Sequence, residues 1–349
     1  MKEYGVGLLG FGLAGRVFHA PLIDAVPGLR LAAVCTSREQ AVRERYPSAQ
    51  VLARAAAVIE HPDVDLVVVA TPNDTHAPMA RAALEAGRHV VVDKPMVPTA
   101  GEAESLMTLA RDRDRLLVPY HNRRWDNDYL TVCRCLDAGL LGEVRTWEVN
   151  YDRFRPDIKE NWREEPGAGA GLLYDLGPHL ADQALARFGM PDWVQADVAS
   201  QRTGARVDDY YHMVLAWGAS RAILHAGTLV RGEAPRMRVH GTRGSFVKYG
   251  LDPQEEALRC GASAAAADWG TEPADLSAEV TTDSGGVELI SHVPSERGDY
   301  PAFYRGVRAA LEGGAQPPVP AQAAVDVLRV IEAAFESSET GRRVPLAAG

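Results

Sequence analysis

The sequence predicts an α/β protein with two domains. We expect an N-terminal Rossmann domain on a doubly wound parallel sheet, then a C-terminal α+β domain on a large, mostly antiparallel open sheet. Three observations carry this prediction. The chain has 349 residues, too many for one ordinary core. Its first third alternates apolar runs with helical stretches, whereas later segments alternate apolar and polar residues.

The apolar runs of the first third are nearly unbroken Val/Leu segments, which are typical of parallel strands buried on both faces. Strands are expected at 4–10, 29–37, 64–72, 88–95 and 115–121, with helices at 15–25, 38–46, 75–86 and 99–113. This βαβ series predicts a dinucleotide-binding domain over residues 1–121.

Residues 122–349 form the predicted substrate and oligomerisation domain. Its alternating segments, typical of strands with one buried face, are 144–154, 193–202, 208–218, 220–230 and 235–249. The polar, Gly/Ser-rich stretch 268–297 predicts a loop or irregular edge. An amphipathic helix is expected at about 320–338, where it would pack back on the first domain, with Val325, Leu328, Ile331 and Phe335 on one stripe.

Composition excludes several classes of function. The net charge of −10 argues against nucleic-acid binding, which needs a basic face, and gives no reason to expect a membrane partner. No apolar run reaches membrane-spanning length, and the N-terminus lacks a signal-peptide pattern. The four cysteines have no metal-binding spacing, so we expect reduced thiols, no metal and a cytoplasmic protein.

A glycine-rich loop follows the first predicted strand and precedes a helix. The segment Gly10-Phe11-Gly12-Leu13-Ala14-Gly15 has the G-x-G-x-x-G spacing of a dinucleotide-phosphate cradle. The first glycine permits the turn, the second lets a pyrophosphate approach and the third lets helix and strand pack together. A glycine-rich turn in an unrelated α/β domain is the alternative interpretation.

The end of the second strand lacks the acid that usually binds the ribose of NAD. The residues there are Thr36, Ser37 and Arg38, which offer two hydroxyls and a guanidinium to a 2′-phosphate. The sequence therefore predicts a preference for NADP. In the alternative, the two hydroxyls cap the next helix and Arg38 is a solvated charge.

Lys94 ends a buried strand as part of Asp93-Lys94-Pro95. Ligands of open α/β sheets bind beyond the carboxyl ends of strands, so this lysine is a candidate to bind a substrate hydroxyl or move its proton. A surface lysine at a strand end is the alternative. The sequence does not decide whether Pro95 is cis.

Asp175 and His179 lie four residues apart in a helix start that follows glycines at 167, 169 and 171. Asp175 is expected to cap this helix and Pro178 to occupy its first turn. His179 would then sit near the positive end of the helix dipole, which keeps the ring available as a base, and the glycines would leave room for a ligand. A capping carboxylate beside a packed histidine is the alternative to a catalytic pair.

The motifs "GFGLAG", "ATPNDTH", "DKP" and "LLYDLGPHLAD" occur in this order and resemble the glucose–fructose oxidoreductase, inositol dehydrogenase and rhizopine-catabolism family. Segments such as "GRVFHAPLI" and "YHNRRWDND" are similar to its NADP-dependent scyllo-inositol dehydrogenase branch. The resemblance covers essentially the whole chain. It implies a Rossmann domain, an open sheet that mediates homo-oligomers (a dimer or tetramer), and Lys94, Asp175 and His179 as catalytic residues. Asp93 replaces the glutamate of the family's usual Glu-Lys-Pro.

The resemblance also assigns cofactor contacts: a segment that lines the nicotinamide ribose, a tryptophan–arginine pair that approaches the cofactor, and the carboxylate beside the lysine. These residues are Thr71, Pro72, Asn73, His76, Asp93, Trp162 and Arg163. From the residue types alone, a polar and aromatic set after the last buried strand suits recognition of hydroxyls. With Tyr151 from the second domain, the candidate substrate contacts are Lys94, His121, Asn122, Arg123, Trp125, Tyr151, Asp175 and His179. Surface charge is the alternative for Arg124 and Asp128.

These features predict an NADP-dependent dehydrogenase or reductase that acts on CH–OH groups of a cyclic polyol, with scyllo-inositol and scyllo-inosose as the best guess. A sugar or sugar-acid dehydrogenase of the same family is one alternative, because only the substrate contacts would differ. A non-enzymatic, cofactor-sensing regulator is another, although such a protein need not keep a lysine, an aspartate and a histidine that handle protons.

Overall fold

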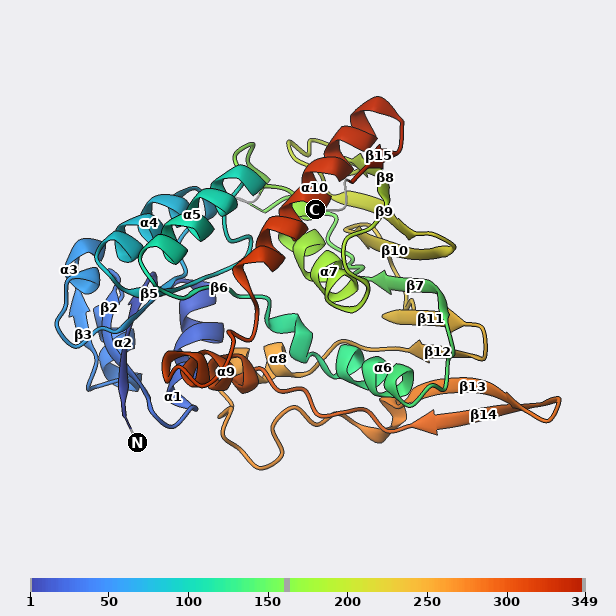
Figure 1. Ribbon diagram of the computed structural model, residues 1–349, viewed down its shortest axis with the longest axis horizontal. Coiled ribbons are helices and arrows are strands. Elements are labelled where there is room, and N and C mark those ends of the chain that lie inside the picture. Colours follow the sequence, from blue (N-terminus) through green and yellow to red (C-terminus); the bar gives the residue numbers. More distant parts are fainter. Residues whose placement is uncertain (1, 160–163, 347–349) are drawn as a thin grey trace. The chain divides into compact units, whose positions relative to one another are not determined.

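A computed structural model describes residues 2–159 and 164–346 of the chain (Figure 1). Its contacts divide the chain into two compact units. The first contains Met1–Asn122, Gln254–Trp269 and Asp299–Val325, and the second contains Arg123–Pro253, Gly270–Gly298 and Asp326–Gly349. The first unit thus contains two later segments of the chain in addition to the N-terminal part. The predicted single boundary at residue 121 does not include these segments.

The first unit is built on a six-stranded sheet in the order β3-β2-β1-β4-β5-β6, with every pair parallel. The predicted Rossmann sheet is thus confirmed, because the strand order reverses at β1 as in a doubly wound fold. The strands are β1 (Tyr4–Leu9), β2 (Leu29–Cys35), β3 (Gln50–Leu52), β4 (Leu66–Val69), β5 (His89–Val92) and β6 (Leu117–Pro119).

Helices connect these strands. Along the chain they are η1 (Ala14–His19, of π type), α1 (Ala20–Asp24), α2 (Glu39–Arg45), α3 (Ala55–Ile59), η2 (Asn73–Thr75), α4 (His76–Glu85) and α5 (Ala100–Asp112). The later segments add α8 (Gln254–Arg259) and α9 (Pro301–Leu311). Strands β1, β4 and β5 are buried almost throughout, which explains their unbroken apolar runs. The short elements β3 and α3 were not expected from the sequence.

The second unit is built on a nine-stranded sheet in the order β14-β13-β12-β11-β7-β10-β9-β8-β15. All its pairs are antiparallel except β7 with β10, so the prediction of a mostly antiparallel sheet is confirmed. The strands are β7 (Val144–Asn150), β8 (Trp193–Ala199), β9 (Tyr210–Trp217), β10 (Ser220–Gly227), β11 (Met237–Gly241), β12 (Gly244–Lys248), β13 (Ala278–Ser284), β14 (Val287–Val293) and β15 (Val344–Pro345).

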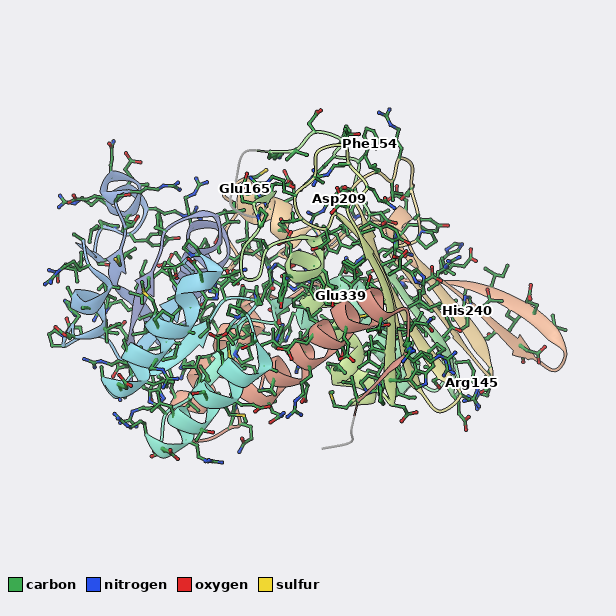
Figure 2. All side chains as sticks on the ribbon, turned by 90° about the horizontal axis from the view of Figure 1, so that it is seen from above. Arg145, Phe154, Glu165, Asp209, His240 and Glu339 are labelled. Atoms are coloured by element: carbon green, nitrogen blue, oxygen red, sulfur yellow. The ribbon has the colours of Figure 1, made fainter. Side chains whose placement is uncertain are left out.

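One face of this sheet is covered by helices. Helix α7 (Leu172–Phe188) packs on β9 and β10, and the sheet's buried residues, among them Trp147, Tyr211 and Phe246, form a core with α7 and α10 (Ala321–Thr340). Figure 2 shows Arg145 and His240 on the opposite face of the sheet. The remaining helices of the unit are η3 (Asn122–Trp125), α6 (Asn127–Asp137) and η5 (Ala274–Leu276).

The expectation of a loop or irregular edge over residues 268–297 was correct about the edge, because β14 is the last strand of the sheet, but wrong about the absence of regular strands. Strands β13 and β14 form a hairpin there, visible in orange in Figure 1, and β13 pairs with β12. Gly285 and Gly286 both have positive φ, as a tight hairpin turn requires. The apolar residues of β14, among them Val287, Leu289 and Ile290, are exposed, so this edge strand lacks the buried apolar face on which the sequence analysis relied. Likewise, the single stretch 235–249 contains two strands, β11 and β12.

Within the described ranges, the helices are too short or too polar to cross a membrane.

Candidate active site

The glycine-rich loop follows β1 and opens helix η1, as the sequence predicted. Gly10 has φ +95°, and a Cβ there would lie 2.5 Å from the carbonyl oxygen of Ala70. A Cβ on Gly15 would lie 2.1 Å from the carbonyl oxygen of Gly10, whereas a Cβ on Gly12 would meet nothing within 4 Å. Two glycines therefore permit the close packing of turn, strand and helix, and the third leaves open space at the helix N-terminus, where a phosphate group fits.

The other loop residues differ in exposure. The Phe11 ring is buried and packs edge-on against Tyr46, with the ring centroids 6.3 Å apart. The Leu13 side chain is exposed, and Ala14 is the first residue of η1. Contacts from this stretch to a phosphate would thus come from backbone N–H groups, whose direction the glycines set.

Arg38 reaches back to this loop from the end of β2. Its Nη1 lies 3.4 Å from the carbonyl oxygen of Phe11, and its backbone N–H donates to Oγ1 of Thr36 over 3.0 Å. Arg38 occupies the N-cap position of helix α2 without a side-chain cap, so the part of the alternative in which Thr36 and Ser37 cap that helix was wrong, whereas its other part, an exposed Arg38, agrees with the structure. A guanidinium beside the phosphate cradle fits a cofactor with an additional phosphate.

His76 connects the ends of two strands. Its Nδ1 lies 2.9 Å from the carbonyl oxygen of Pro95, and its Nε2 lies 2.9 Å from that of Thr71. The ring is buried, as is Asn73, while Pro72 precedes the short helix η2. The Lys94–Pro95 peptide bond is cis. His76 thereby ties the loop after β4 to the turn after β5 that carries Lys94.

Asp93 is held by several groups at the end of β5. Its Oδ1 accepts a hydrogen bond from the backbone N–H of Lys94 over 2.8 Å, and its Oδ2 lies 3.8 Å from Nε2 of His19. Burial raises the pKa of this carboxyl, but the facing His19, together with Lys94 and His76, outweighs burial and holds the pKa below its usual range. Asp93 is therefore a carboxylate at neutral pH.

The start of helix α7 corrects the expectations for Asp175 and Pro178. The helix begins at Leu172, so Asp175 does not cap it, and Pro178 lies beyond the first turn. The cap comes from Asp208, whose Oδ2 accepts from Leu173 N over 2.7 Å and whose carbonyl oxygen accepts from Leu172 N over 2.9 Å. Asp208 is 35 residues away in sequence, so no local pattern could indicate it.

Gly171 serves this cap and not a ligand. It has φ +90°, and a Cβ there would lie 1.9 Å from Oδ1 of Asp208. Glycine is therefore needed so that the Asp208 carboxylate can approach the helix start. For Gly167, a Cβ would meet nothing within 4 Å, so the expectation of free space holds at that position.

His179 lies two turns inside α7 and is buried. The helix dipole acts mainly within the first turn, so the expected influence of its positive end on His179 was wrong. Asp175 lies one turn earlier on the same side of the helix. Burial raises the pKa of the Tyr211 hydroxyl, and Arg236 opposes that increase. The charges of Asp175 and Asp208 raise the same pKa further, so both carboxylates act on Tyr211 in β9.

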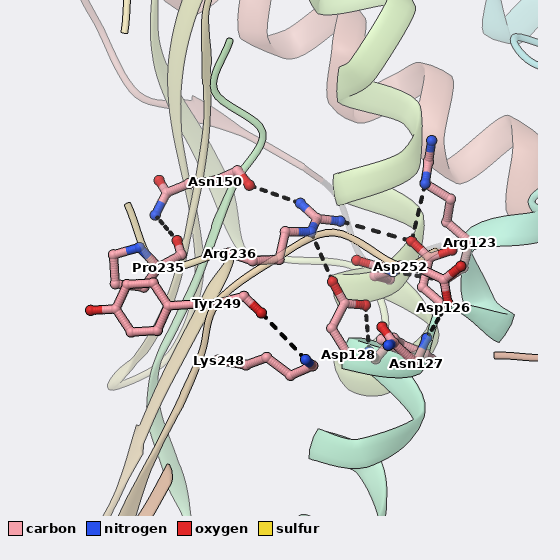
Figure 3. A network of polar contacts seen from close by, with 12 residues as sticks. Arg123, Asp126, Asn127, Asp128, Asn150, Pro235, Arg236, Lys248, Tyr249 and Asp252 are labelled. Atoms are coloured by element: carbon pink, nitrogen blue, oxygen red, sulfur yellow. Dashed lines mark hydrogen bonds and ion pairs between the residues drawn. The ribbon is translucent and has the colours of Figure 1, made fainter. Parts of the chain in front are cut away.

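Arg123 belongs to the buried polar network of Figure 3, and the Tyr151 ring packs beside it. Arg123 pairs with Asp126, with 3.2 Å between Nη1 and Oδ2, and its guanidinium lies 5.1 Å from the Tyr151 ring centroid. Arg236 also lies over this ring, at 4.7 Å, and bonds Asp128 over 2.8 Å. Arg123 and Tyr151 thus have structural partners of their own, in addition to the substrate role predicted for them.

The neighbouring charges are not surface charges. Asp128 is fully buried, and Arg124 forms a two-pronged pair with Asp182 at 2.8 and 2.7 Å, so the surface alternative was wrong for both. His121 and Asn122 are buried as well, and Trp125 ends the short helix η3. Trp162 and Arg163 lie outside the described residues.

Within residues 2–159 and 164–346, no group of three or more His, Cys, Asp or Glu side chains could hold a metal ion. The sequence analysis did not select His19 and Tyr304, two further residues of the first unit. His19 faces Asp93 at the end of β5, and the Tyr304 hydroxyl contacts the His19 ring. His19 ends the helix that the glycine loop opens, a position that a helical pattern starting at Gly15 could have indicated.

Comparison with known proteins agrees with this geometry. Residues 4–121 match a family model described as an oxidoreductase family with an NAD-binding Rossmann fold, and residues 134–346 match the C-terminal alpha/beta domain of the same oxidoreductase family. The uncharacterized oxidoreductase YdgJ of Escherichia coli is 46% identical over 335 residues, which cover 96% of each chain.

The scyllo-inositol 2-dehydrogenase (NADP(+)) IolW of Bacillus subtilis is 41% identical, over 98% of this chain and 95% of its own. Among solved structures, the oxidoreductase yvaA of Bacillus subtilis superposes with a TM-score of 0.97 at 40% identity and covers 99% of each chain.

Proposed function

This chain belongs to the Gfo/Idh/MocA family of NAD(P)-binding oxidoreductases, and we propose that it transfers hydride between NADP(H) and a ring carbinol or ketone of a cyclic polyol, with scyllo-inositol and scyllo-inosose as the pair to test first. The observation that carries the cofactor choice is the Arg38 guanidinium beside the Phe11 carbonyl, at the end of a strand that lacks an acid. Similarity to a protein named as an NADP-dependent scyllo-inositol dehydrogenase supports the substrate choice.

The residues present fit a dinucleotide. Open space at Gly12 and the N-terminus of η1 suit the pyrophosphate, and Arg38 with Thr36 and Ser37 suits a 2′-phosphate. The segment of Thr71, Pro72, Asn73 and His76, with Trp162 and Arg163, would contact the nicotinamide half. When bound, the nicotinamide supplies the hydride chemistry.

The chain's own residues would handle the proton. His179 takes the hydroxyl proton during oxidation and returns it during reduction, Lys94 binds that hydroxyl, and Asp175 orients the substrate. General acid–base help of this kind contributes about 10²- to 10⁴-fold to a rate. The other proposed substrate contacts are His121, Asn122, Arg123, Trp125 and Tyr151.

The cofactor proposal is tested by Arg38→Ala, with KM measured for NADPH and for NADH. Loss of a charge-assisted pair predicts a roughly tenfold to hundredfold higher KM for NADPH and little change for NADH. Arg43→Ala is a matched control on helix α2, which Arg38 precedes, because Arg43 is exposed and pairs with Glu39. A wild-type protein that prefers NADH, or an Arg38→Ala variant that discriminates as the wild type does, would contradict the proposal.

The catalytic proposal is tested by His179→Ala, Lys94→Ala and the double variant, assayed with NADPH and a panel of inososes, aldoses and sugar acids. We expect each single variant to lose about 10²- to 10⁴-fold in kcat while it still binds NADPH. The double variant should lose far less than the product of the two losses, because groups that act as one unit are not additive. His240→Ala, on the opposite face of the sheet, is the control.

Near-normal turnover by His179→Ala would refute the assignment of the base. Activity on an aldose or a sugar acid, and none on inositols, would favour the sugar dehydrogenase alternative. Tight binding of NADPH without turnover on any compound of the panel would favour a cofactor-sensing regulator. We also propose that the open sheet mediates a homo-oligomer, which light scattering of the purified protein tests directly.

A further inference from the structure

A chain of buried polar contacts in the first unit leads from α9 to the residue that precedes Lys94. The hydroxyl of Tyr304, on α9, lies 2.6 Å from Nδ1 of His19, at the end of η1. Nε2 of His19 lies 3.8 Å from Oδ2 of Asp93, and Oδ1 of Asp93 accepts from Lys94 N. His19 and Tyr304 are both fully buried.

The two neighbours of His19 select one form of its ring. A neutral imidazole has one N–H and one lone pair. If the hydrogen were on Nδ1, the lone pair of Nε2 would face the Asp93 carboxylate, which is repulsive. If Tyr304 donates its O–H to Nδ1, the hydrogen is on Nε2 and faces Asp93, which is attractive. Burial raises the pKa of Tyr304 far above its usual value, so its hydroxyl keeps the proton that it donates.

We propose that His19, with its ring orientation fixed by Tyr304, is a positioning residue that keeps Asp93 ionised and thereby holds Lys94 for the proposed reaction. The Asp93 carboxylate accepts the Lys94 amide hydrogen, and the Lys94 ammonium is one of the charges that lower the pKa of Asp93. This inference rests on the proposed function for its catalytic consequence, but its structural content is independent of activity.

The geometry also accounts for the aspartate at this position. Asp93 spans the Lys94 amide on one oxygen and the His19 ring on the other. A glutamate is one methylene longer, so it could not keep both contacts without a backbone shift. The groups that face Asp93 are His19, Lys94 and His76, with the Tyr304 ring also within electrostatic range.

Rings pack around His19 and limit its movement. The Tyr120 ring lies 4.2 Å from the His19 ring between centroids, and Phe303 packs edge-on against Tyr120 at 4.8 Å. Because the histidine is enclosed by aromatic side chains, its orientation depends on its polar contacts with Tyr304 and Asp93 and not on solvent.

The first experiment reads the ring itself, in the ligand-free protein. Nitrogen-15 labelling of histidine, with the His19 signal assigned by its loss in His19→Gln, reports which ring nitrogen carries hydrogen. We expect a neutral ring with hydrogen on Nε2 alone. Hydrogen on Nδ1, in a neutral ring or in an imidazolium, would overturn the inference whether or not the protein is an enzyme.

The second experiment compares pH profiles of kcat for His19→Leu, His19→Gln and Tyr304→Phe. His19→Leu removes the polar ring that faces Asp93, so protonation of Asp93 begins at higher pH. We expect the acidic limb of the profile to move to higher pH and kcat at neutral pH to fall about threefold to tenfold, as for the loss of one electrostatic contact worth up to about one pKa unit. The KM for NADPH should stay within about twofold of the wild type.

His19→Gln retains an N–H near the position of Nε2 and should restore most of the wild-type profile. Tyr304→Phe should shift the profile in the same direction as His19→Leu but by less. Tyr4→Phe is the matched control, because the Tyr4 hydroxyl is also a buried donor, over 3.0 Å to the carbonyl oxygen of Leu311, without contact to Asp93. A profile unchanged in His19→Leu, or shifted equally in Tyr4→Phe, would overturn the inference.

If the wild-type protein reduces no substrate with NADPH, the proposed function fails, and the ring measurement alone decides the inference about His19.

Discussion

The cap of helix α7 allows a prediction whose size follows from the structure. Asp208 accepts the backbone N–H of Leu173 over 2.7 Å, and this helix carries Asp175 and His179. Asp208→Ala removes the cap and leaves a partly buried N–H without its acceptor. The two effects overlap, and together they should lower the free energy of unfolding by about 2 kcal/mol. For a unit of this size that corresponds to roughly 4–8 °C in melting temperature.

The same carboxyl should make stability depend on pH. Burial raises the pKa of Asp208 to about 6, although the N–H groups of Leu173 and Leu172 oppose the increase. The folded protein therefore binds this proton more tightly than the unfolded chain, in which the carboxyl has its ordinary pKa of 3.8. Proton binding by Asp208 therefore stabilises the folded protein. This contribution to the free energy of unfolding, up to about 3 kcal/mol, is complete below pH 4 and is lost as the pH rises to about 6.

Asp208→Asn keeps an acceptor oxygen but cannot ionise. Compared with the wild type, it should be more stable above pH 6 and should lack this contribution to the slope between pH 4 and pH 6. Urea midpoints measured from pH 4 to 8 test both expectations, with Asp197→Asn as the control, since Asp197 is exposed on β8. An Asp208→Asn variant with the wild-type slope, or an Asp208→Ala variant as stable as the wild type, would refute the reasoning.

Three further outcomes follow from packing. Gly15→Ala should abolish NADPH binding, measured by fluorescence titration, because its Cβ would lie 2.1 Å from a loop carbonyl, whereas Gly101→Ala, with open space around it, should bind normally. Gly171→Ala should destabilise the protein by more than Asp208→Ala, because it adds backbone strain at φ +90° to the loss of the cap; equal melting temperatures would contradict this. Arg124→Met should cost about 3–5 kcal/mol in urea unfolding, because it leaves the buried Asp182 carboxylate unpaired.

Local patterns predicted much of the fold correctly. The Val runs of β4 and β5 mark strands buried on both faces, and the spacing of Gly10, Gly12 and Gly15 marks the loop between β1 and η1. These signals are reliable because each depends on residues that are neighbours in the chain. The hairpin of β13 and β14 carries a local signal as well, Gly285-Gly286 between two strand-like runs, but its exposed strands lack the buried apolar face that identified the other strands.

The fold class, the phosphate-binding glycine loop and the candidate proton-transfer residues could be predicted from the sequence, because each depends on a short segment with a recognisable pattern. Three contacts became known from the folded chain: Asp208 caps α7, Arg124 pairs with Asp182, and His19 faces Asp93. Each of these contacts joins residues tens of positions apart. The packing of strands and helices brings these residues together, so no pattern of neighbouring residues in the sequence can predict which of them will meet.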